Sequence, residues 1–556
     1  MRGSWVGAAI VWLAAGCGLL GAVPTLTGVT PGGVGPGASL PVKFAGKLDG
    51  EMRRVWCDDS QVVFTVPDAA GAAVVTVAAG TRPGVKWVRL VNAEGASSAV
   101  RFVVSPVPRV DEKEPNDELS APQMLGTMPV WVHGQLDKAG DVDGYGVKLR
   151  KGVPVWIRVD GYSLGSGVDL MMHVVNPRGE RVATASDSRN LDPEVVFTPE
   201  VDGVHVVQIA GFVHPPAADV NFTGSGGKFY QMHFSEGPVV TRVFPAAVPL
   251  EGKGTVTLFG PGVKAGTKAE VVVAQINGEL DRGELVLKDA PLPLEVVRAR
   301  HPVVEGAGAS AEAPVVVKVP CVVASRIPAA GKEAAFKVAM KKGERFQARF
   351  WSRSIGLGVE GNVTVYNPAG ERVAANANPA DVFTEPTVAW SAAVEGEYSV
   401  RVGDLFGRCG EDFDFVLEIA PPAPDVSVSL VDGKSLRVEP GKSVTLKAKV
   451  TLSGGWKEPL VLRVNGLPDG VAAPEVAVPE KGGDVDIKVE AALNAPLSTA
   501  AAWVSVWSKG ETPRWIGAAY PVRADTKRGQ TSTDFSRELW VTAGPALPPE
   551  PPPKKK

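Results

Sequence analysis

The chain repeats itself at the scale of whole domains, and this repetition limits the folds that it can adopt. Several segments recur in the same order and without a gap in the longest pairs. The matching pairs are 138–152 with 329–343, 175–183 with 366–374, 202–209 with 395–402, and 24–31 with 238–245. The chain therefore contains two kinds of unit in the order A-B-A-B, followed by a fifth unit of another kind.

The residues of each B unit predict β-strands. Val153, Val155, Ile157 and Val159 alternate with other residues, which is typical of a strand with one buried face. The Asn-Pro-x-Gly turn at 176–179 suits a hairpin, because Pro fixes φ and Gly allows positive φ. The 63 Gly and 47 Pro residues among 556 favour short strands joined by tight turns. We predict an all-β chain of tandem β-sandwich domains, arranged like beads on a string.

The repeats also predict the boundaries of these domains. Units of about 100 residues are an ordinary size for one domain. The predicted segments are a signal peptide at 1–22, the first A unit at 23–107, the first B unit at 108–236, the second A unit at 237–320, the second B unit at 321–421, the fifth unit at 422–543, and a flexible Pro- and Lys-rich tail at 544–556.

The N-terminus predicts export. Arg2 precedes an uncharged run over 3–23. A short positive region followed by an apolar stretch is typical of a signal peptide. Three processing routes stay open: lipidation of Cys17 after a lipobox-like Ala-Ala-Gly, cleavage near Ala22, or retention as a membrane anchor. Each route exports the chain, to the periplasm, the outer membrane or the medium, and contact with a membrane is expected only through this N-terminus.

Four cysteines are too few for a disulfide scaffold, and their spacing does not suggest zinc. Because export permits disulfides, Cys321 and Cys409 either form a bond or remain two free thiols. The net charge of −3 and the lack of a Lys/Arg block argue against a nucleic-acid partner.

Several motifs place 108–236 in a family. Glu112-Lys-Glu-Pro-Asn-Asp117, Gly134-Gln-Leu136, Gly140-Asp-Val-Asp143 and Asn176-Pro-x-Gly179 resemble the bacterial pre-peptidase C-terminal (PPC) domain. The second B unit is a degenerate match. The A units resemble IPT/TIG immunoglobulin-like (Ig-like) modules, and the fifth unit is similar to Ig-like modules attached to glycosidases, mainly through 466–471. The PPC resemblance implies a jelly-roll-like sandwich that aids substrate or matrix binding beside secreted proteases and in collagenases; it does not imply a peptidase in this chain.

An acidic group in the first B unit predicts a calcium site. Calcium takes six to eight oxygen ligands in flexible geometry, which carboxylates and an Asn amide supply. The resemblance to collagen-binding relatives implies calcium at the same residue types. The candidate ligands are Glu112, Glu114, Asn116, Asp117, Asp137, Asp141 and Asp143.

Two observations bear on this prediction. Relatives usually carry an aromatic residue directly after the last Asp, whereas Gly144 follows Asp143 here and would rotate it away. The second B unit has Lys332 and Ala334 in place of Asp141 and Asp143, so we expect it to bind no ion. The alternative is a solvated acidic linker whose Asn and Asp side chains cap turns.

The motifs of enzymes are weak in this sequence. Gly161-Tyr-Ser-Leu-Gly165 fits the nucleophile elbow, but the next residues read as a strand, whereas the elbow requires a helix. We therefore expect no catalytic residues and no enzyme activity.

The prediction is a secreted or cell-surface binding, adhesion or scaffold protein that recognises an extracellular polysaccharide or protein. The alternative is an accessory subunit of a separate secreted peptidase or glycoside hydrolase. Trp131, Trp351, Trp515 and Trp540 are candidates for exposed stacking residues, although core packing accounts better for each.

Overall fold

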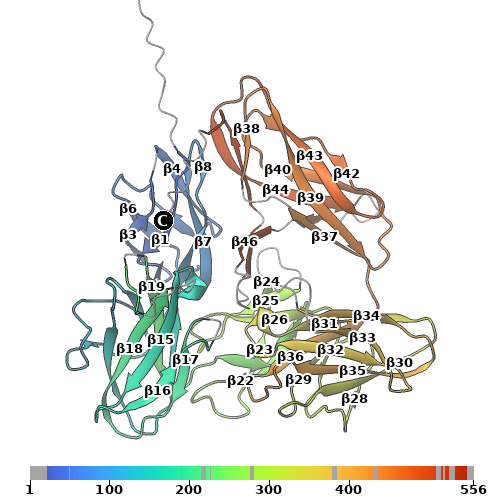
Figure 1. Cartoon of the computed structure of the whole chain (residues 1–556), viewed down its shortest axis with the longest axis horizontal. Coiled ribbons are helices and arrows are strands. Elements are labelled where there is room, and N and C mark those ends of the chain that lie inside the picture. The colour runs from blue at the N-terminus through green and yellow to red at the C-terminus, as the bar shows by residue number, and fades with distance from the viewer. Residues whose placement is uncertain are drawn as a thin grey trace, which may run out of the picture.

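The computed structural model describes residues 22–547 except 49, 189–190, 214–220, 226, 276–280, 378–384, 431–434, 509–514, 518–519, 525–532 and 537. Over these residues the regular elements are strands and two short 3₁₀ turns, so the predicted all-β fold is confirmed (Figure 1). Within the same residues, no helix is both long and apolar enough to span a bilayer. The predicted signal segment, with Cys17, and the tail from 548 lie outside the described residues.

The first A unit is a sandwich of two sheets. One sheet has the order β1-β3-β6-β5, and the other has the order β2-β9-β7-β4 with β8 beside β7. The strands are β1 (Gly28–Thr30), β2 (Gly33–Val34), β3 (Ser39–Ala45), β4 (Met52–Cys57), β5 (Val62–Phe64), β6 (Ala72–Val77), β7 (Gly84–Asn92), β8 (Gly95–Ala96) and β9 (Val100–Val104).

The first B unit is a larger sandwich with sheets β10-β12-β19-β14-β17 and β11-β13-β18-β15-β16. Its elements are β10 (Arg109–Asp111), β11 (Gln123–Met124), β12 (Val130–Gln135), β13 (Asp143–Leu149), β14 (Val155–Asp160), η1 (Tyr162–Leu164), β15 (Val168–Val175), β16 (Arg181–Ala185), β17 (Glu194–Phe197), β18 (Gly203–Val213) and β19 (Phe229–Glu236).

The second A unit has sheets β20-β22-β23 and β21-β26-β25-β24. Its strands are β20 (Arg242–Phe244), β21 (Ala247–Pro249), β22 (Gly254–Phe259), β23 (Lys268–Val271), β24 (Ala274–Gln275), β25 (Arg282–Leu285) and β26 (Leu294–Ala299).

The second B unit repeats the strand order of the first, with sheets β27-β29-β36-β31-β34 and β28-β30-β35-β32-β33. Its elements are β27 (Val303–Glu305), β28 (Val315–Val316), β29 (Cys321–Arg326), β30 (Ala334–Met340), β31 (Arg345–Trp351), η2 (Arg353–Ile355), β32 (Gly361–Tyr366), β33 (Arg372–Asn376), β34 (Thr387–Ser391), β35 (Gly396–Asp404) and β36 (Asp414–Ala420).

The fifth unit has sheets β37-β39-β43-β41 and β38-β48-β44-β40-β42, with β45 paired to β44 and β46 paired to β47. Its strands are β37 (Asp425–Leu430), β38 (Ser435–Val438), β39 (Ser443–Ser453), β40 (Leu460–Asn465), β41 (Val471–Ala472), β42 (Val476–Ala477), β43 (Gly483–Ala491), β44 (Ser498–Ser508), β45 (Trp515–Gly517), β46 (Tyr520–Ala524), β47 (Thr533–Ser536) and β48 (Leu539–Ala543).

The register of the strands reproduces the sequence repeat. In the first B unit β13 pairs antiparallel with β18, from Asp143↔Ile209 to Leu149↔Gly203. In the second B unit β30 pairs with β35 in the same way, from Ala334↔Val402 to Met340↔Gly396. The matched segments therefore occupy the same places in two copies of one sandwich.

One boundary lies elsewhere than predicted. Strands β27 and β28 pair with β29 and β30, so they belong to the second B unit, which begins near residue 302 rather than at 321. They correspond to β10 and β11 of the first copy. The sequence repeat did not reach them because the acidic segment that follows β10 is missing from the second copy.

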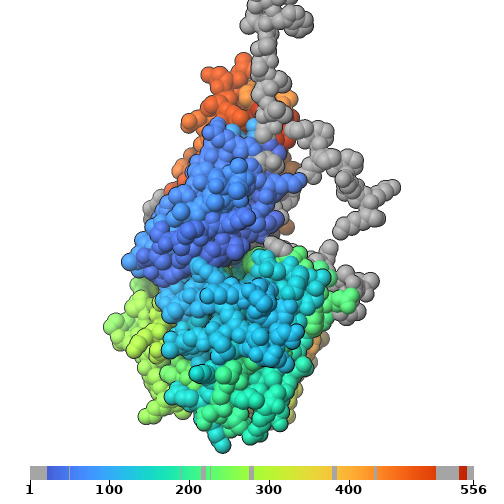
Figure 2. Space-filling model, turned by 90° about the vertical axis from the view of Figure 1, so that its left-hand side faces the viewer, coloured from blue at the N-terminus to red at the C-terminus, as the bar shows by residue number. Residues whose placement is uncertain are grey.

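Each A unit packs against the B unit that follows it, as Figure 2 shows for the first pair. The first A unit covers the outer face of β12, where Trp131 is fully buried against Val103 and Leu164. The second A unit packs on the second B unit through an apolar cluster that includes Val297 and Trp351.

The fifth unit also contacts the first A unit (Figure 1). The Arg437 guanidinium pairs with the Glu94 carboxylate at 2.6 Å, and the exposed fractions of these side chains are 18% and 6%. Trp540 packs edge-on against Trp56, with ring centroids 5.7 Å apart. The fifth unit thus returns to the first A unit, a contact that an arrangement like beads on a string does not include.

Candidate metal centre

The acidic residues of the first B unit gather at one end of its sandwich. Strand β10 pairs with β12 in one sheet, and β11 pairs with β13 in the other. The segment 112–122 must therefore cross between the sheets, and it passes over the start of β13. Gly144 fixes the crossing: its N–H donates to the Asn116 carbonyl at 3.1 Å, and a Cβ on Gly144 would lie 2.8 Å from that oxygen.

Four carboxylates meet at this crossing. Oxygens of Glu114, Asp117, Asp141 and Asp143 all lie within 4.8 Å of one another. Asp141 and Asp143 are fully buried, whereas Glu114 is exposed. Gly144 thus lets the acidic segment approach β13, and it does not turn Asp143 away from the group as the sequence comparison predicted.

Some oxygens of this group have no hydrogen-bond partner. In the described part of the chain, Oδ1 of Asn116, Asp117 and Asp143 is buried and accepts no hydrogen bond. A buried, unsatisfied carboxylate oxygen costs free energy unless a cation or donor meets it. These oxygens are therefore free to coordinate a cation.

Two of the predicted ligands, Glu112 and Asp137, accept hydrogen bonds from neighbouring groups. Glu112 accepts hydrogen bonds from the Gln135 backbone N–H at 2.6 Å and from Asn116 Nδ2 at 3.2 Å, which fastens the crossing segment to β12. Asp137 accepts from the Gln135 side chain and lies outside the group of four. Glu112 and Asp137 thus lie outside the group of four, and their role as direct ligands stays a prediction.

Three residues of the site were not predicted from the sequence. The Tyr230 hydroxyl donates to Asp143 Oδ2 at 2.5 Å and lies 2.6 Å from the Tyr145 hydroxyl. The Lys138 ammonium pairs with Asp117 at 2.7 Å and with Asp141 at 3.4 Å. The position of Lys138, one residue after Asp137 in an acidic turn, was the available signal for an internal counter-ion.

The electrostatics reflect the crowding and burial of these carboxyl groups. Burial, and then the charge of Glu112, raise the pKa of Asp143 to about 10, so that this carboxyl holds a proton at neutral pH. Burial also raises the pKa of Glu112. A divalent cation at the group would displace that proton.

The donor set fits calcium. Calcium–oxygen distances are about 2.3–2.6 Å, so ligands on opposite sides of one ion lie about 5 Å apart, close to the spacing of these oxygens. Hydrogen bonds fix the Asp141 carboxylate, because its Oδ2 accepts the backbone N–H groups of Asp137 and Lys138 at 2.5 and 3.4 Å. Glu114, Asp117, Asp141 and Asp143 would hold the ion, and Asn116 and water would complete the six to eight oxygens.

The second B unit differs at the same place. Lys332 and Ala334 stand where the first copy has Asp141 and Asp143, and the Lys332 ammonium pairs with Glu312 at 3.2 Å. A shallow cavity of about 320 Å³ lies here, lined by Glu312, Lys332, Glu333, Asn362 and Asp404 among others. Among the residues that the structure describes, the acidic group of the first B unit has no counterpart in the second.

The serine motif forms a structural corner. Ser163 lies in η1, where its hydroxyl donates to Asp160 at 3.2 Å and its backbone N–H donates to Asp192 at 2.9 Å. Asp192 also accepts the N–H groups of Gly161 and Tyr162. Its carboxylate therefore caps the turn.

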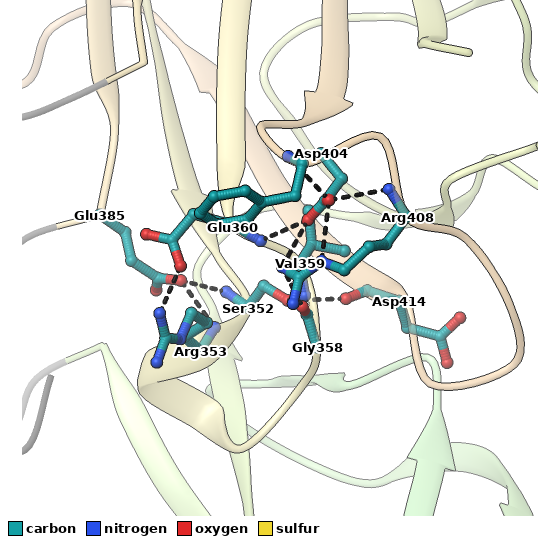
Figure 3. Close-up of polar contacts among 10 residues, drawn as sticks. Ser352, Arg353, Gly358, Val359, Glu360, Glu385, Asp404, Arg408 and Asp414 are labelled. Atoms are coloured by element: carbon teal, nitrogen blue, oxygen red, sulfur yellow. Dashed lines mark hydrogen bonds and ion pairs between the residues drawn. The ribbon is translucent and has the colours of Figure 1, made fainter. Parts of the chain in front are cut away.

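The same corner recurs in the second B unit (Figure 3). Glu385 accepts the backbone N–H groups of Ser352 and Arg353 at 2.6 and 2.8 Å, in the manner of Asp192. Nearby, Asp404 accepts from Glu360 N–H at 2.9 Å and holds the Arg408 guanidinium. A carboxylate-capped turn in both copies is a feature of the fold.

Cys321 and Cys409 do not form a disulfide with each other. Cys321 is fully buried at the start of β29, and Cys409 is exposed; both are free thiols. The loop that carries Cys409 joins β36 at Asp414, which pairs with Arg326 at the far end of β29. Five strand residues, roughly 16 Å, separate that end from Cys321, whereas a disulfide needs Cα atoms within about 7 Å.

Most tryptophans predicted as stacking candidates are buried. Trp131, Trp351 and Trp540 have exposed fractions of 0, 8 and 1%. Each packs on a neighbouring unit or a partner strand. The side chain of Trp515 lies outside the described residues.

Comparison with known proteins gives no family. No family model matches the chain, and no curated protein matches it. Solved structures with some likeness include a tetra-tandem repeat from the extending region of a large adhesion protein (TM-score 0.12, 10% identity, covering 90% of this chain and 95% of that one). Domains 1–6 of the surface layer protein SbsC give a TM-score of 0.13 at 12% identity, covering 95% of this chain and 55% of that one.

The four N-terminal Ig domains of Dscam1 isoform 4.44 give a TM-score of 0.16 at 9% identity, covering 94% of this chain and 98% of that one. At TM-scores this low the whole chains do not superpose. The fold of this chain therefore rests on its own strand pairing.

Proposed function

We propose that this chain is an exported, non-catalytic scaffold that holds binding surfaces for an extracellular polymer, either a polysaccharide or a protein. The observation that carries the proposal is the packing between units. Buried side chains such as Trp131 and the Glu94–Arg437 pair join the sandwiches at fixed positions, as a scaffold requires and a flexible spacer does not.

The acidic group of the first B unit supports the same proposal. Calcium bound by Glu114, Asp117, Asp141 and Asp143 would fasten segment 112–122, which crosses between the two sheets of the first B unit. Calcium sites of about 10⁻⁴–10⁻³ M affinity are typical of extracellular modules. The metal would thus stiffen the scaffold only after export.

Retention on polymers tests the proposal. The purified full chain is mixed with insoluble polysaccharides and with immobilised matrix proteins, in calcium and in chelator. We expect retention on at least one class of polymer, and more of it in calcium. A chain retained by none of them in either buffer would refute the proposal, and retention only through a co-purifying hydrolase would favour the accessory-subunit alternative.

A further inference from the structure

The outer face of the fifth unit presents two tryptophans on one strand. Along β44, Trp503, Ser505 and Trp507 alternate with Val504 and Val506, whose side chains are 0 and 1% exposed. Because alternate residues of a strand share a face, both tryptophans lie on the side away from the core. Trp503 is 41% exposed, and Trp507 is half-buried.

Hydrogen-bonding groups fill the space between the two rings. In the pairing of β44 with β40, Asn465 lies opposite Trp503, and Arg463 lies opposite Ser505. The Ser505 hydroxyl accepts from Asn465 Nδ2 at 3.0 Å and from Trp507 Nε1 at 2.9 Å. Ser505 itself is fully buried and fixes the Trp507 ring, whereas Asn465 and Arg463 beside it are half-buried.

The rings are held in place before any ligand arrives. The Trp503 ring lies against the backbone of Gly466, where an added Cβ would be 2.6 Å from a ring carbon. The Arg463 guanidinium lies over the Trp507 ring, 4.9 Å from its centroid. A preformed surface loses little conformational entropy on binding.

The face carries no unbalanced charge at its centre. Arg463 pairs with the Glu475 carboxylate at 2.7 Å. A polyanion would gain little from this balanced pair, whereas a neutral ligand with hydroxyl groups can use both members as donor and acceptor.

We propose that this face binds a neutral polysaccharide chain, which lies along β44 and stacks sugar rings on Trp503 and Trp507. Sugar rings combine an apolar face with hydroxyl groups at the rim, which matches two rings with the half-buried Asn465 and Arg463 beside them. Four residues along a strand span roughly 13 Å, so the ligand is a chain rather than a single sugar. This inference rests on the proposed function and names the polymer class and its site.

The apolar area is too broken for a protein partner's hydrophobic core. Val461, which pairs with Trp507 across the strands, is only 6% exposed. Protein interfaces usually centre on a contiguous, desolvated apolar patch. The separated rings favour the saccharide.

Substitution of the two rings tests the site in the full chain. Retardation in native gels containing soluble neutral glucans, mannans or xylans gives an affinity for Trp503→Ala, Trp507→Ala and the double variant. We expect each Ala variant to bind at least about tenfold more weakly, as for a Trp anchor. Trp503→Phe and Trp507→Phe should keep most of the affinity because a ring remains, and Leu493→Ala, which alters an 85% exposed side chain elsewhere in the unit, should keep all of it.

The outcomes separate this site from the proposed function. Binding to a neutral polysaccharide that the double variant retains would overturn the site and leave the proposed function standing. Binding only to a matrix protein, or only to acidic polysaccharides with loss at high salt, would overturn the polymer class. A panel of neutral polysaccharides without any retardation, or self-association abolished by the Trp variants, would overturn the inference.

Discussion

Calcium should stabilise the first B unit and leave the second unchanged. Extracellular calcium sites have dissociation constants of about 10⁻⁴–10⁻³ M, and a hundredfold excess of ligand over its dissociation constant adds about 2.7 kcal/mol to the free energy of unfolding. For a unit of this size that gain corresponds to a rise in melting temperature on the order of 10 °C.

The variant Asp141→Asn should remove this stabilisation. An Asn at 141 keeps an acceptor for the N–H groups of Asp137 and Lys138 but loses the charge. At about 2.4 Å from a divalent ion, one carboxylate gains about 3 kcal/mol even with the dielectric constant of water. That loss weakens calcium binding on the order of a hundredfold, which leaves almost no shift at the same calcium concentration.

Calorimetry of the full chain, with hydrogen exchange to locate the effect, measures this directly. We expect calcium to protect peptides over 109–149 and not those over 303–340. Asp137→Asn, outside the group of four, is the matched control and should respond like the wild type. Equal melting and equal exchange in calcium and in chelator would show that the acidic group is a solvated linker.

Three further predictions concern charge and thiols. Lys138→Gln removes the internal counter-ion, so it should tighten calcium binding several-fold in titration calorimetry; unchanged or weaker binding would contradict this. Burial lowers the pKa of His233 to about 4 despite the nearby Asp160 carboxylate. The unfolded chain therefore binds a proton at this histidine near pH 6.5, whereas the folded chain binds it only near pH 4. The free energy of unfolding should fall by up to about 3 kcal/mol between pH 6.5 and 4. In His233→Gln, denaturation measured over this pH range should show a smaller fall. Cys409 should react with a thiol reagent in the native chain and Cys321 only after unfolding; an unreactive pair that reductant releases would indicate a disulfide.

The sequence predicted the fold well because its signals are local. The alternation over 153–159 and the Asn-Pro-x-Gly turns are properties of single strands and hairpins, and they appear in β14 and between β15 and β16. The matched segments 138–152 and 329–343 contain the equivalent strands β13 and β30. The predicted start of the second B unit was wrong, because β27 and β28 are recognised only by their pairing with β29 and β30.

The site was only partly predictable. Asp141 and Asp143 were identified from their motif, but the roles of Glu112 and Asp137 depend on donors that the folded turn brings to them. These are the Gln135 backbone N–H for Glu112 and the Gln135 side-chain amide for Asp137. Tyr230 lies far along the chain, and only the pairing of strands brings it to Asp143.

The tryptophans illustrate a different limit. Alternation shows that Trp131 points away from the core of its own sandwich, yet the neighbouring A unit covers that face. Trp503-Val-Ser-Val-Trp507 has the same alternation, and there Trp503 stays exposed and Trp507 half-buried. Period-two patterns identify the face of a strand, and contacts between units decide whether it meets solvent.

The central claim, that the chain binds an extracellular polymer without cutting it, is tested most directly on the polymer itself. The full chain is incubated in calcium with each polymer that retains it, and the size distribution of the polymer is then measured by chromatography. The account predicts a chain that is bound and a polymer whose length is unchanged. A polymer shortened by the purified chain, or no polymer that retains it, would contradict the claim.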